Sequence, residues 1–289
     1  MEFMQPLDWE EALEVKAAHP EARPIFGGTD VMVELNFGRE RPEVLMDLTR
    51  VPELREWGEE DGRLRIGAGV TYTRIIEELK ERLPGLAMAS RTVGSPQIRN
   101  RGTVGGNLGT SSPAGDALPP LYVSGAEVEV ASVRGVRRIP VEEFVRGPKR
   151  NALREDELIL SFLLPGARGP QQYAKIGPRN AMVIAVCSLG LALDPERREL
   201  GVCIGSAGPT PIRAREAEGF IRGVLEEENL WESRGEIGES ALARFGELVA
   251  GAAKPISDVR GTAEYRRHAV AVLARRVLRW AWEEYREGR

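Results

Sequence analysis

The chain has 289 residues, a length that favours about two domains. Of these residues 42% are hydrophobic and 29% are charged, a composition typical of a globular protein. Forty Lys and Arg stand against 44 Asp and Glu, and the net charge of -4 excludes a general attraction to nucleic acid or to an anionic membrane surface. The N-terminus lacks a basic segment followed by a long apolar run, and no stretch approaches the roughly eighteen apolar residues that cross a bilayer. We therefore expect a cytoplasmic protein.

The first quarter of the chain shows short alternating elements. Asp8 is a predicted cap for a helix that ends near His19, where Pro20 follows. Residues 23–26 read as a short strand, 31–35 as a helix and 44–48 as a strand. The segments 54–57 and 64–66 flank a polar stretch and predict a hairpin.

Helices are then predicted from a cap at Thr71 to residue 79 and over 86–93. Residues 94–120 are rich in Gly, Ser, Thr, Asn and Pro, and we expect a long irregular segment of the kind that usually has a function. Strands are predicted at 128–133, 136–139 and 158–164, with a short helix at 140–144.

A polar stretch at 166–172 marks a predicted domain boundary near residue 170. Beyond it, segments 173–176, 182–193 and 200–204 predict a small antiparallel sheet. Helices are expected at 213–225, 240–250 and 262–285.

The chain has too few cysteines and histidines to hold a metal redox centre of its own. Cys187 and Cys203 lie in apolar, strand-like segments and are expected to be buried thiols. Two cysteines are too few for four-cysteine iron–sulfur ligation by this chain alone, and with only two histidines, His19 and His268, both expected to be structural, a zinc site is disfavoured. Any metal redox centre is expected on another chain.

Two glycine loops, Phe26-Gly27-Gly28-Thr29-Asp30 and Thr103-Val104-Gly105-Gly106-Asn107, are the most informative motifs. Paired glycines permit positive φ and let successive backbone amides converge on phosphate oxygens. Either loop alone also fits an ordinary turn. Together they predict a dinucleotide held by amides, although neither has the spacing of a Rossmann or P-loop motif.

With the two loops, Ser112-Pro113-Ala114-Gly115-Asp116 and the segment from Asp258 to Arg266, the chain resembles the FAD-binding medium subunit of molybdenum hydroxylases, the xanthine dehydrogenase and aerobic carbon monoxide dehydrogenase group. The resemblance implies an α+β fold: a two-subdomain FAD-binding domain of the vanillyl-alcohol-oxidase (PCMH) type, then a small C-terminal domain with a three-stranded antiparallel sheet and helices. The implied domains are 1–170, with subdomains of about 1–55 and 56–170, and 171–289.

The resemblance also implies which residues contact FAD. The two loops would lie against the diphosphate, Asp116 would bond a hydroxyl of the sugar or ribityl portion, Ile159 would give an apolar contact, and Lys175 would lie near the flavin ring. Asp116 could instead cap its own loop, and Lys175 could instead be a solvated charge at a strand end. The predicted cofactor-binding residues are Pro24, Ile25, Phe26, Gly27, Gly28, Thr29, Asp30, Val31, Thr103, Val104, Gly105, Gly106, Asn107, Asp116, Ile159 and Lys175, with no catalytic or metal-binding residue.

One position departs from the family pattern. Val183 stands where the family often has an Asp, which puts in doubt the contacts that admit NAD as the final acceptor. A further branch of the family carries a four-iron cluster in this subunit, and the two cysteines argue against that here.

The function that the resemblance implies is electron transfer. The chain would take electrons from a two-iron cluster on a small partner subunit to FAD and pass them to NAD, quinone, oxygen or a carrier protein. The substrate would react at a molybdopterin centre on a large partner subunit, in a dimer of heterotrimers. Two alternatives stay open: a stand-alone flavin oxidase or dehydrogenase of the same fold, and a non-redox binding protein whose glycine loops are only turns.

Overall fold

The computed structural model describes residues 1–39 and 41–288, which form two compact units built from interleaved segments. Unit 1 comprises residues 1–75, 95–112 and 125–165, and unit 2 comprises 76–94, 113–124 and 166–289, of which Arg289 lies outside the described residues. Each unit is described by itself.

Unit 1 begins with a parallel three-stranded sheet of order β1-β3-β2, formed by β1 (Glu2–Met4), β2 (Arg23–Ile25) and β3 (Val44–Asp47). The buried Ala12 of helix α1 (Trp9–Ala18) and Met46 of β3 belong to one apolar cluster. The predicted cap is confirmed, because Asp8 Oδ1 accepts from the Glu11 amide at 2.8 Å. Helix α2 (Val31–Asn36) follows the first glycine loop directly, also as predicted.

The second sheet of unit 1 is antiparallel, with the order β4-β5-β10-β6-β7. Its strands are β4 (Trp57–Glu60), β5 (Arg63–Gly67), β6 (Glu127–Ser132), β7 (Gly135–Pro140) and β10 (Leu158–Leu164). The predicted β4–β5 hairpin is confirmed, but its expected bounds are wrong. Leu54 lies in a 3₁₀ helix, η1 (Pro52–Arg55), and β4 runs on to Glu60 because the turn needs only Asp61 and Gly62, whose φ angles are 51° and 72°.

The expectation of an irregular segment over 94–120 is wrong, because three short helices lie there. They are α5 (Pro96–Arg99), α6 (Val104–Thr110) and α7 (Leu118–Val123). Ser95 and Thr103 cap the first two with their hydroxyls, and local capping outweighs the poor helix propensity of the glycines. The remaining elements of unit 1 are α8 (Val141–Phe144) and the hairpin of β8 (Val145–Gly147) with β9 (Arg150–Asn151); α3 (Tyr72–Glu78) begins there and ends in unit 2.

Unit 2 has a central antiparallel sheet of β11 (Gln171–Ile176), β12 (Cys187–Asp194), β13 (Glu199–Gly205) and β14 (Ile212–Arg213). The expected three strands are present, and the two-residue β14 is a fourth. The predicted start of the second strand at residue 182 is wrong: Met182 has a φ of +50°, and pairing begins only at Cys187. Burial raises the pKa of the Cys187 thiol to about 12, and Cys203 is buried as well, as expected.

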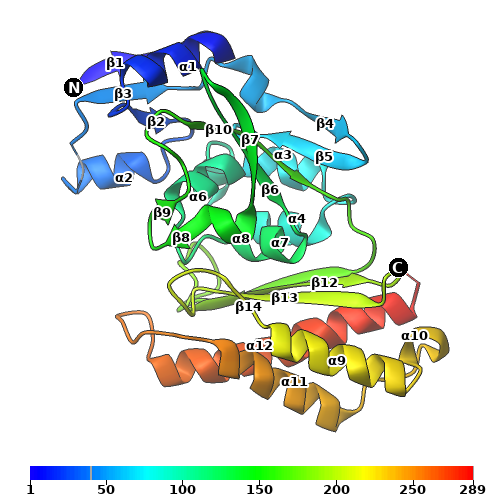
Figure 1. Ribbon diagram of the computed structural model, residues 1–289. Coiled ribbons are helices and arrows are strands. Elements are labelled where there is room, and N and C mark those ends of the chain that lie inside the picture. The colour runs from blue at the N-terminus through cyan, green and yellow to red at the C-terminus, as the bar shows by residue number, and fades with distance from the viewer. Residues whose placement is uncertain (40, 289) are drawn as a thin grey trace. The chain divides into compact units, whose positions relative to one another are not determined.

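Helices cover both faces of the unit 2 sheet. Figure 1 shows α9 (Arg215–Glu227), α11 (Glu239–Ala252) and α12 (Ala263–Arg286) together on one face, with the short α10 (Leu230–Ser233) beside α9. Leu189 and Leu191 of β12 pack there in one apolar core with residues such as Phe245. On the other face lie α4 (Pro84–Arg91) and α7, and Gly190 and Gly205 leave room for Pro119 of α7.

Candidate functional site

The two predicted glycine loops lie against each other in unit 1. A Cβ atom on Gly27 would stand 2.0 Å from the carbonyl oxygen of Arg101, just before the second loop. At the end of α6, the Thr110 hydroxyl donates to Asp30 Oδ2 of the first loop at 2.9 Å. Residues that are far apart in the sequence therefore form one continuous backbone surface.

The missing side chains of the glycines serve mainly this packing. A Cβ on Gly105 would stand 2.4 Å from the Ala68 carbonyl oxygen, so β5 and α6 could not approach as closely with any other residue. Gly28 differs, since its φ of +74° is a left-handed conformation that glycine adopts readily. Of the two features expected of these glycines, the positive φ is therefore found at Gly28, whereas access to a ligand stays a prediction.

The start of α6 offers polar groups of the kind that bind an anion. Thr103 Oγ1 accepts from the Gly106 amide at 2.8 Å, while the first amides of any helix have no intrahelical acceptor. Gly106 is exposed. Among the described residues, Asn107 Oδ1 is a buried side-chain oxygen without a hydrogen-bond partner. Because a buried polar atom is normally satisfied, Asn107 indicates a ligand at this place.

Ile159 of β10 joins this group. It is half-buried, next to an irregularity in the β10–β6 register, and its Cδ1 atom lies 3.7 Å from the position of a Cβ on Gly109 of α6. Asn151 Nδ2 donates to the Gly109 carbonyl at 2.9 Å. The structure thus brings both loops and Ile159 together around α6.

Helix α2 is held beside the first loop by the ion pairs of one buried carboxylate, that of Glu34. Glu34 is 5% exposed and pairs with Arg23 of β2 and Lys149 of the β8–β9 turn. The half-buried Pro24 and Ile25 lie in β2, and the Phe26 ring faces inward against Gly69. These contacts fix both ends of the first loop.

The other two predicted site residues, Asp116 and Lys175, form a buried ion pair in unit 2. Lys175 Nζ lies 2.6 Å from Asp116 Oδ2, and Tyr173 donates its hydroxyl to Asp116 Oδ1 at 2.8 Å. The alternative of a solvated strand-end charge is wrong for Lys175, whose side chain is only 7% exposed. Loop capping is not what Asp116 does either, because its strong partners are side chains of β11.

Burial dominates the electrostatics of this pair. It raises the pKa of Asp116, against the opposing effects of Lys175, Tyr173 and Thr92. Burial, followed by the nearby Asp116 charge, raises the pKa of Tyr173 well above its usual value, so this phenol stays protonated and donates.

Sequence reasoning missed the residues that support the site. Tyr173 lies two positions from Lys175 on one strand, so the alternation of side chains along a strand could have placed both on one face. Thr110, Asn151 and the carbonyl of Arg101 had no such signal, because their contacts depend on chain packing.

No group of three or more His, Cys, Asp or Glu side chains that could hold a metal ion occurs within residues 1–39 and 41–288. In the same part of the chain, no helix combines the length and apolar character that a membrane crossing requires.

The arrangement in unit 1 fits the diphosphate of a dinucleotide. Backbone amides and hydroxyls such as that of Thr29 are neutral donors suited to phosphate oxygens, and the unsatisfied Asn107 adds a side-chain amide that can turn its NH₂ group to an acceptor. Comparison with known proteins agrees: residues 1–167 match the FAD binding domain in molybdopterin dehydrogenase, and residues 172–281 match the CO dehydrogenase flavoprotein C-terminal domain. The chain belongs to this family of FAD-binding dehydrogenase subunits.

Particular relatives span nearly the whole chain. The xanthine dehydrogenase FAD-binding subunit of Escherichia coli O157:H7 is 31% identical over 93% of this chain and 91% of its own length. The nicotinate dehydrogenase FAD-subunit of Eubacterium barkeri is 34% identical over 77% of this chain and 80% of its own. A carbon monoxide dehydrogenase structure from Hydrogenophaga pseudoflava superposes with a TM-score of 0.88 at 25% identity, covering 98% of both chains.

These similarities confirm four predictions: the family resemblance, the α+β fold class, the oxidoreductase-subunit class and FAD as the cofactor. The individual FAD contacts and the domain boundary near residue 170 stay predictions.

Proposed function

We propose that this chain is the FAD-carrying electron-transfer subunit of a molybdenum hydroxylase complex in the cytoplasm. It takes electrons from an iron–sulfur cluster on a partner and delivers them to an external acceptor, which is NAD, quinone, oxygen or a carrier protein. The observation that carries the proposal is the packing of the two glycine loops around α6, where Asn107 has a buried, unsatisfied amide oxygen.

In this proposal the chain itself binds and orients. Residues 24–31 and 103–107 hold the diphosphate, and Ile159 gives an apolar contact beside α6. Asp116 and Lys175 are proposed to lie on the sugar, ribityl and ring side of the cofactor. Bound FAD would supply the capacity to accept and release electrons.

The partners in the proposal are a large molybdopterin-binding subunit and a small subunit with two-iron clusters, arranged as a dimer of heterotrimers. Its support is that the relatives are named as FAD subunits, and that metal redox groups would need ligands which the chain lacks among its described residues. The substrate would then react on the large subunit.

FAD titration of the purified full chain, followed by flavin fluorescence, tests the cofactor site. Asn107→Asp keeps the side-chain shape but puts a carboxylate beside a diphosphate, so we expect the Kd to rise at least tenfold, about 1.4 kcal/mol. Gly106→Val fills the exposed surface of the loop, where a Cβ meets only Thr103 Oγ1 at 3.2 Å, and should weaken binding similarly.

The matched control is Gly219→Ala, which adds a methyl group in open space on α9 and should leave the Kd unchanged. Gly105→Val is less informative, because it would disturb the packing on Ala68. If both Asn107→Asp and Gly106→Val bound FAD like the wild type, the loops would be turns and the proposed site would lie elsewhere.

The electron route is tested by co-expressing the chain with the products of neighbouring reading frames. We expect co-purification with a molybdopterin subunit and a cysteine-rich subunit, and bleaching of flavin absorbance when the iron–sulfur subunit is reduced. Substrate turnover by the isolated FAD-loaded chain would instead support the stand-alone enzyme.

A further inference from the structure

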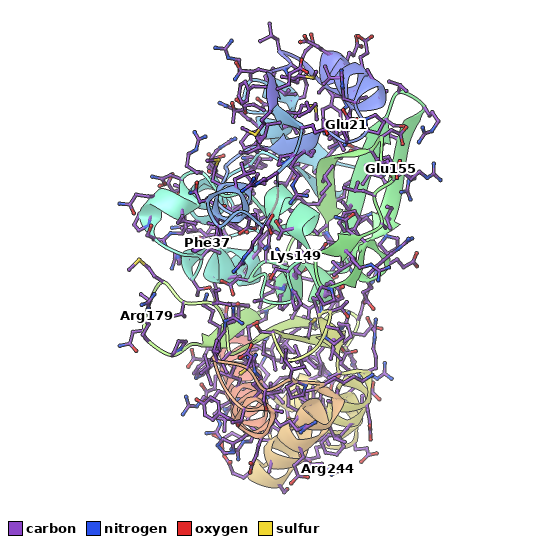
Figure 2. All side chains as sticks on the ribbon, turned by 90° about the vertical axis from the view of Figure 1, so that its left-hand side faces the viewer. Glu21, Phe37, Lys149, Glu155, Arg179 and Arg244 are labelled. Atoms are coloured by element: carbon purple, nitrogen blue, oxygen red, sulfur yellow. The ribbon has the colours of Figure 1, made fainter. Side chains whose placement is uncertain are left out.

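The loop between β11 and β12, residues 177–186, is held firmly at its end, where the buried Ala185 and Val186 accept from the side chains of Ser206 and Arg266, and by fewer contacts over residues 177–184. It contains no helix or strand, and the side chains of Met182 and Ile184 are 56% and 53% exposed. Figure 2 shows Arg179 at its outer end, and the Arg179 guanidinium bonds only locally, to the carbonyls of Ala181 and Met182. The loop therefore needs an anchor to keep one conformation.

Lys175 supplies that anchor. Its ammonium group has three donor hydrogens, and the structure provides three acceptors from three different segments of unit 2. They are the Thr92 carbonyl after α4 at 2.9 Å, Asp116 Oδ2 at 2.6 Å, and the Val183 carbonyl of the loop at 3.2 Å. All three hydrogens are thus used inside the unit.

Asp116 in turn fixes the position of Lys175. Its carboxylate is buried, with Oδ1 bonded by Tyr173 and Oδ2 by Lys175. Moving Lys175 away would leave the Asp116 carboxylate buried without its ion-pair partner, which is costly in free energy. The two side chains therefore stay together. The bond to Val183 is the member of this network that reaches into the middle of the loop.

We propose that Lys175 is a positioning residue that holds the outer part of this loop, residues 177–184, against the rest of unit 2 through the Val183 carbonyl, with Asp116 as the support that keeps Lys175 in place. This role differs from a contact with the flavin, and it operates in the FAD-free chain as well. Breaking the bond to Val183 releases the loop while the sheet and its helices remain folded.

Trypsin cleavage after Arg179 in the full-length, FAD-free chain measures the release, because cleavage follows the population of the open loop. Lys175→Met should speed this cleavage at least tenfold, since Val183 loses a charge-assisted hydrogen bond. Tyr173→Phe removes a bond to Asp116 but leaves Lys175 and Val183 joined, and should leave the rate within twofold of wild type. Lys254→Met, on the surface of the same unit, is the matched control for charge removal.

The decisive variant is Lys175→Met with Asp116→Leu. Replacing a buried ion pair by apolar side chains is often neutral for stability, so urea unfolding should return toward the wild-type midpoint. Trypsin should nevertheless cleave this double variant after Arg179 at least tenfold faster than it cleaves the wild type, because Lys175 no longer donates to the Val183 carbonyl. This variant also decides the matter if Lys175→Met alone fails to fold.

Wild-type protection of Arg179 in the double variant would overturn the proposal, because the pair would then act only through stability. Release of the loop by Tyr173→Phe to the same extent as by Lys175→Met would overturn it too. Neither result depends on FAD binding, so the proposed function is tested separately.

Discussion

At the scale of single residues, Glu157 shows how a buried carboxylate stabilises unit 1. It is 4% exposed and accepts two bonds from Arg137 of β7, at 2.8 and 2.7 Å, and one from the Arg154 amide at 2.8 Å. The Arg137 bonds are the main reason that the pKa of Glu157 lies below its usual value. A lowered folded-state pKa stabilises the protein above the unfolded-state pKa, and this stabilisation is lost as the pH falls through the folded-state pKa.

Glu157→Gln should therefore lower the free energy of unfolding by about 1–3 kcal/mol at pH 7. The difference from wild type should shrink as the pH falls below about 4.5. Urea unfolding at several pH values between 7 and 3 measures it, with Glu155→Gln as the control, because Glu155 is an exposed neighbour (Figure 2). A difference that stayed constant down to pH 3 would show that the Glu157 charge is not the cause.

The same scale shows where sequence reasoning stops. The glycine loops could be recognised because a local motif carries them. The pairing of Asp116 with Lys175 could not, because the two residues are 59 positions apart and only the packing of the 113–124 segment on β11 joins them. A role assigned from the sequence to either residue alone misses that each is the other's main partner.

At the scale of elements, prediction succeeded where a pattern is long or strongly apolar. Helix α12 and strand β10 were located within a residue or two, since their apolar residues repeat over many positions. Helices α5 and α6 were missed because each has a single capping side chain and little apolar periodicity. Their caps, Ser95 and Thr103, were visible in the sequence, but Ser and Thr are equally common in irregular loops.

Capping also predicts the behaviour of α12. Thr262 Oγ1 accepts from the Tyr265 amide at 3.1 Å at the start of this 24-residue helix. Thr262→Ala should cost about 1 kcal/mol and speed hydrogen exchange in the first turn, whereas Thr262→Ser should retain most of the stability. Equal losses in both variants would mean that the Thr262 methyl group, not the cap, stabilises the helix.

At the scale of the whole molecule, the chain crosses between its units several times. The family matches divide it between residues 167 and 172, close to the boundary predicted near residue 170. Unit 2 nevertheless includes α4 and α7 from the first part of the chain, and α7 packs on β12 and β13. The change of family matches thus lies close to the last crossing between the packed units, at residues 165–166, but the earlier crossings have no counterpart in the family matches.

This arrangement predicts that the two parts need each other to fold. A fragment of residues 1–170 keeps α7 but loses the strands beneath it, which uncovers the side of α7 that lies against Gly190, Gly201 and Gly205, with the buried Pro119 and the half-buried Val123. Exposing a buried apolar side chain to water costs about 1.5–3 kcal/mol, which is large compared with the net free energy of unfolding of a domain. The fragment should aggregate or bind a hydrophobic dye, and co-expression with 171–289 should restore a soluble complex.

Size-exclusion chromatography and dye binding measure the outcome, and the control interrupts the chain near the same place without separating the two parts. A flexible Gly-Ser insertion between Ala167 and Arg168 of the intact chain leaves both parts tethered, so it should fold and unfold as the wild type does. If the 1–170 fragment alone were monomeric and unfolded cooperatively, residue 170 would be a true folding boundary. In that case the packing of α4 and α7 on the sheet would contribute little to the stability of the first part of the chain.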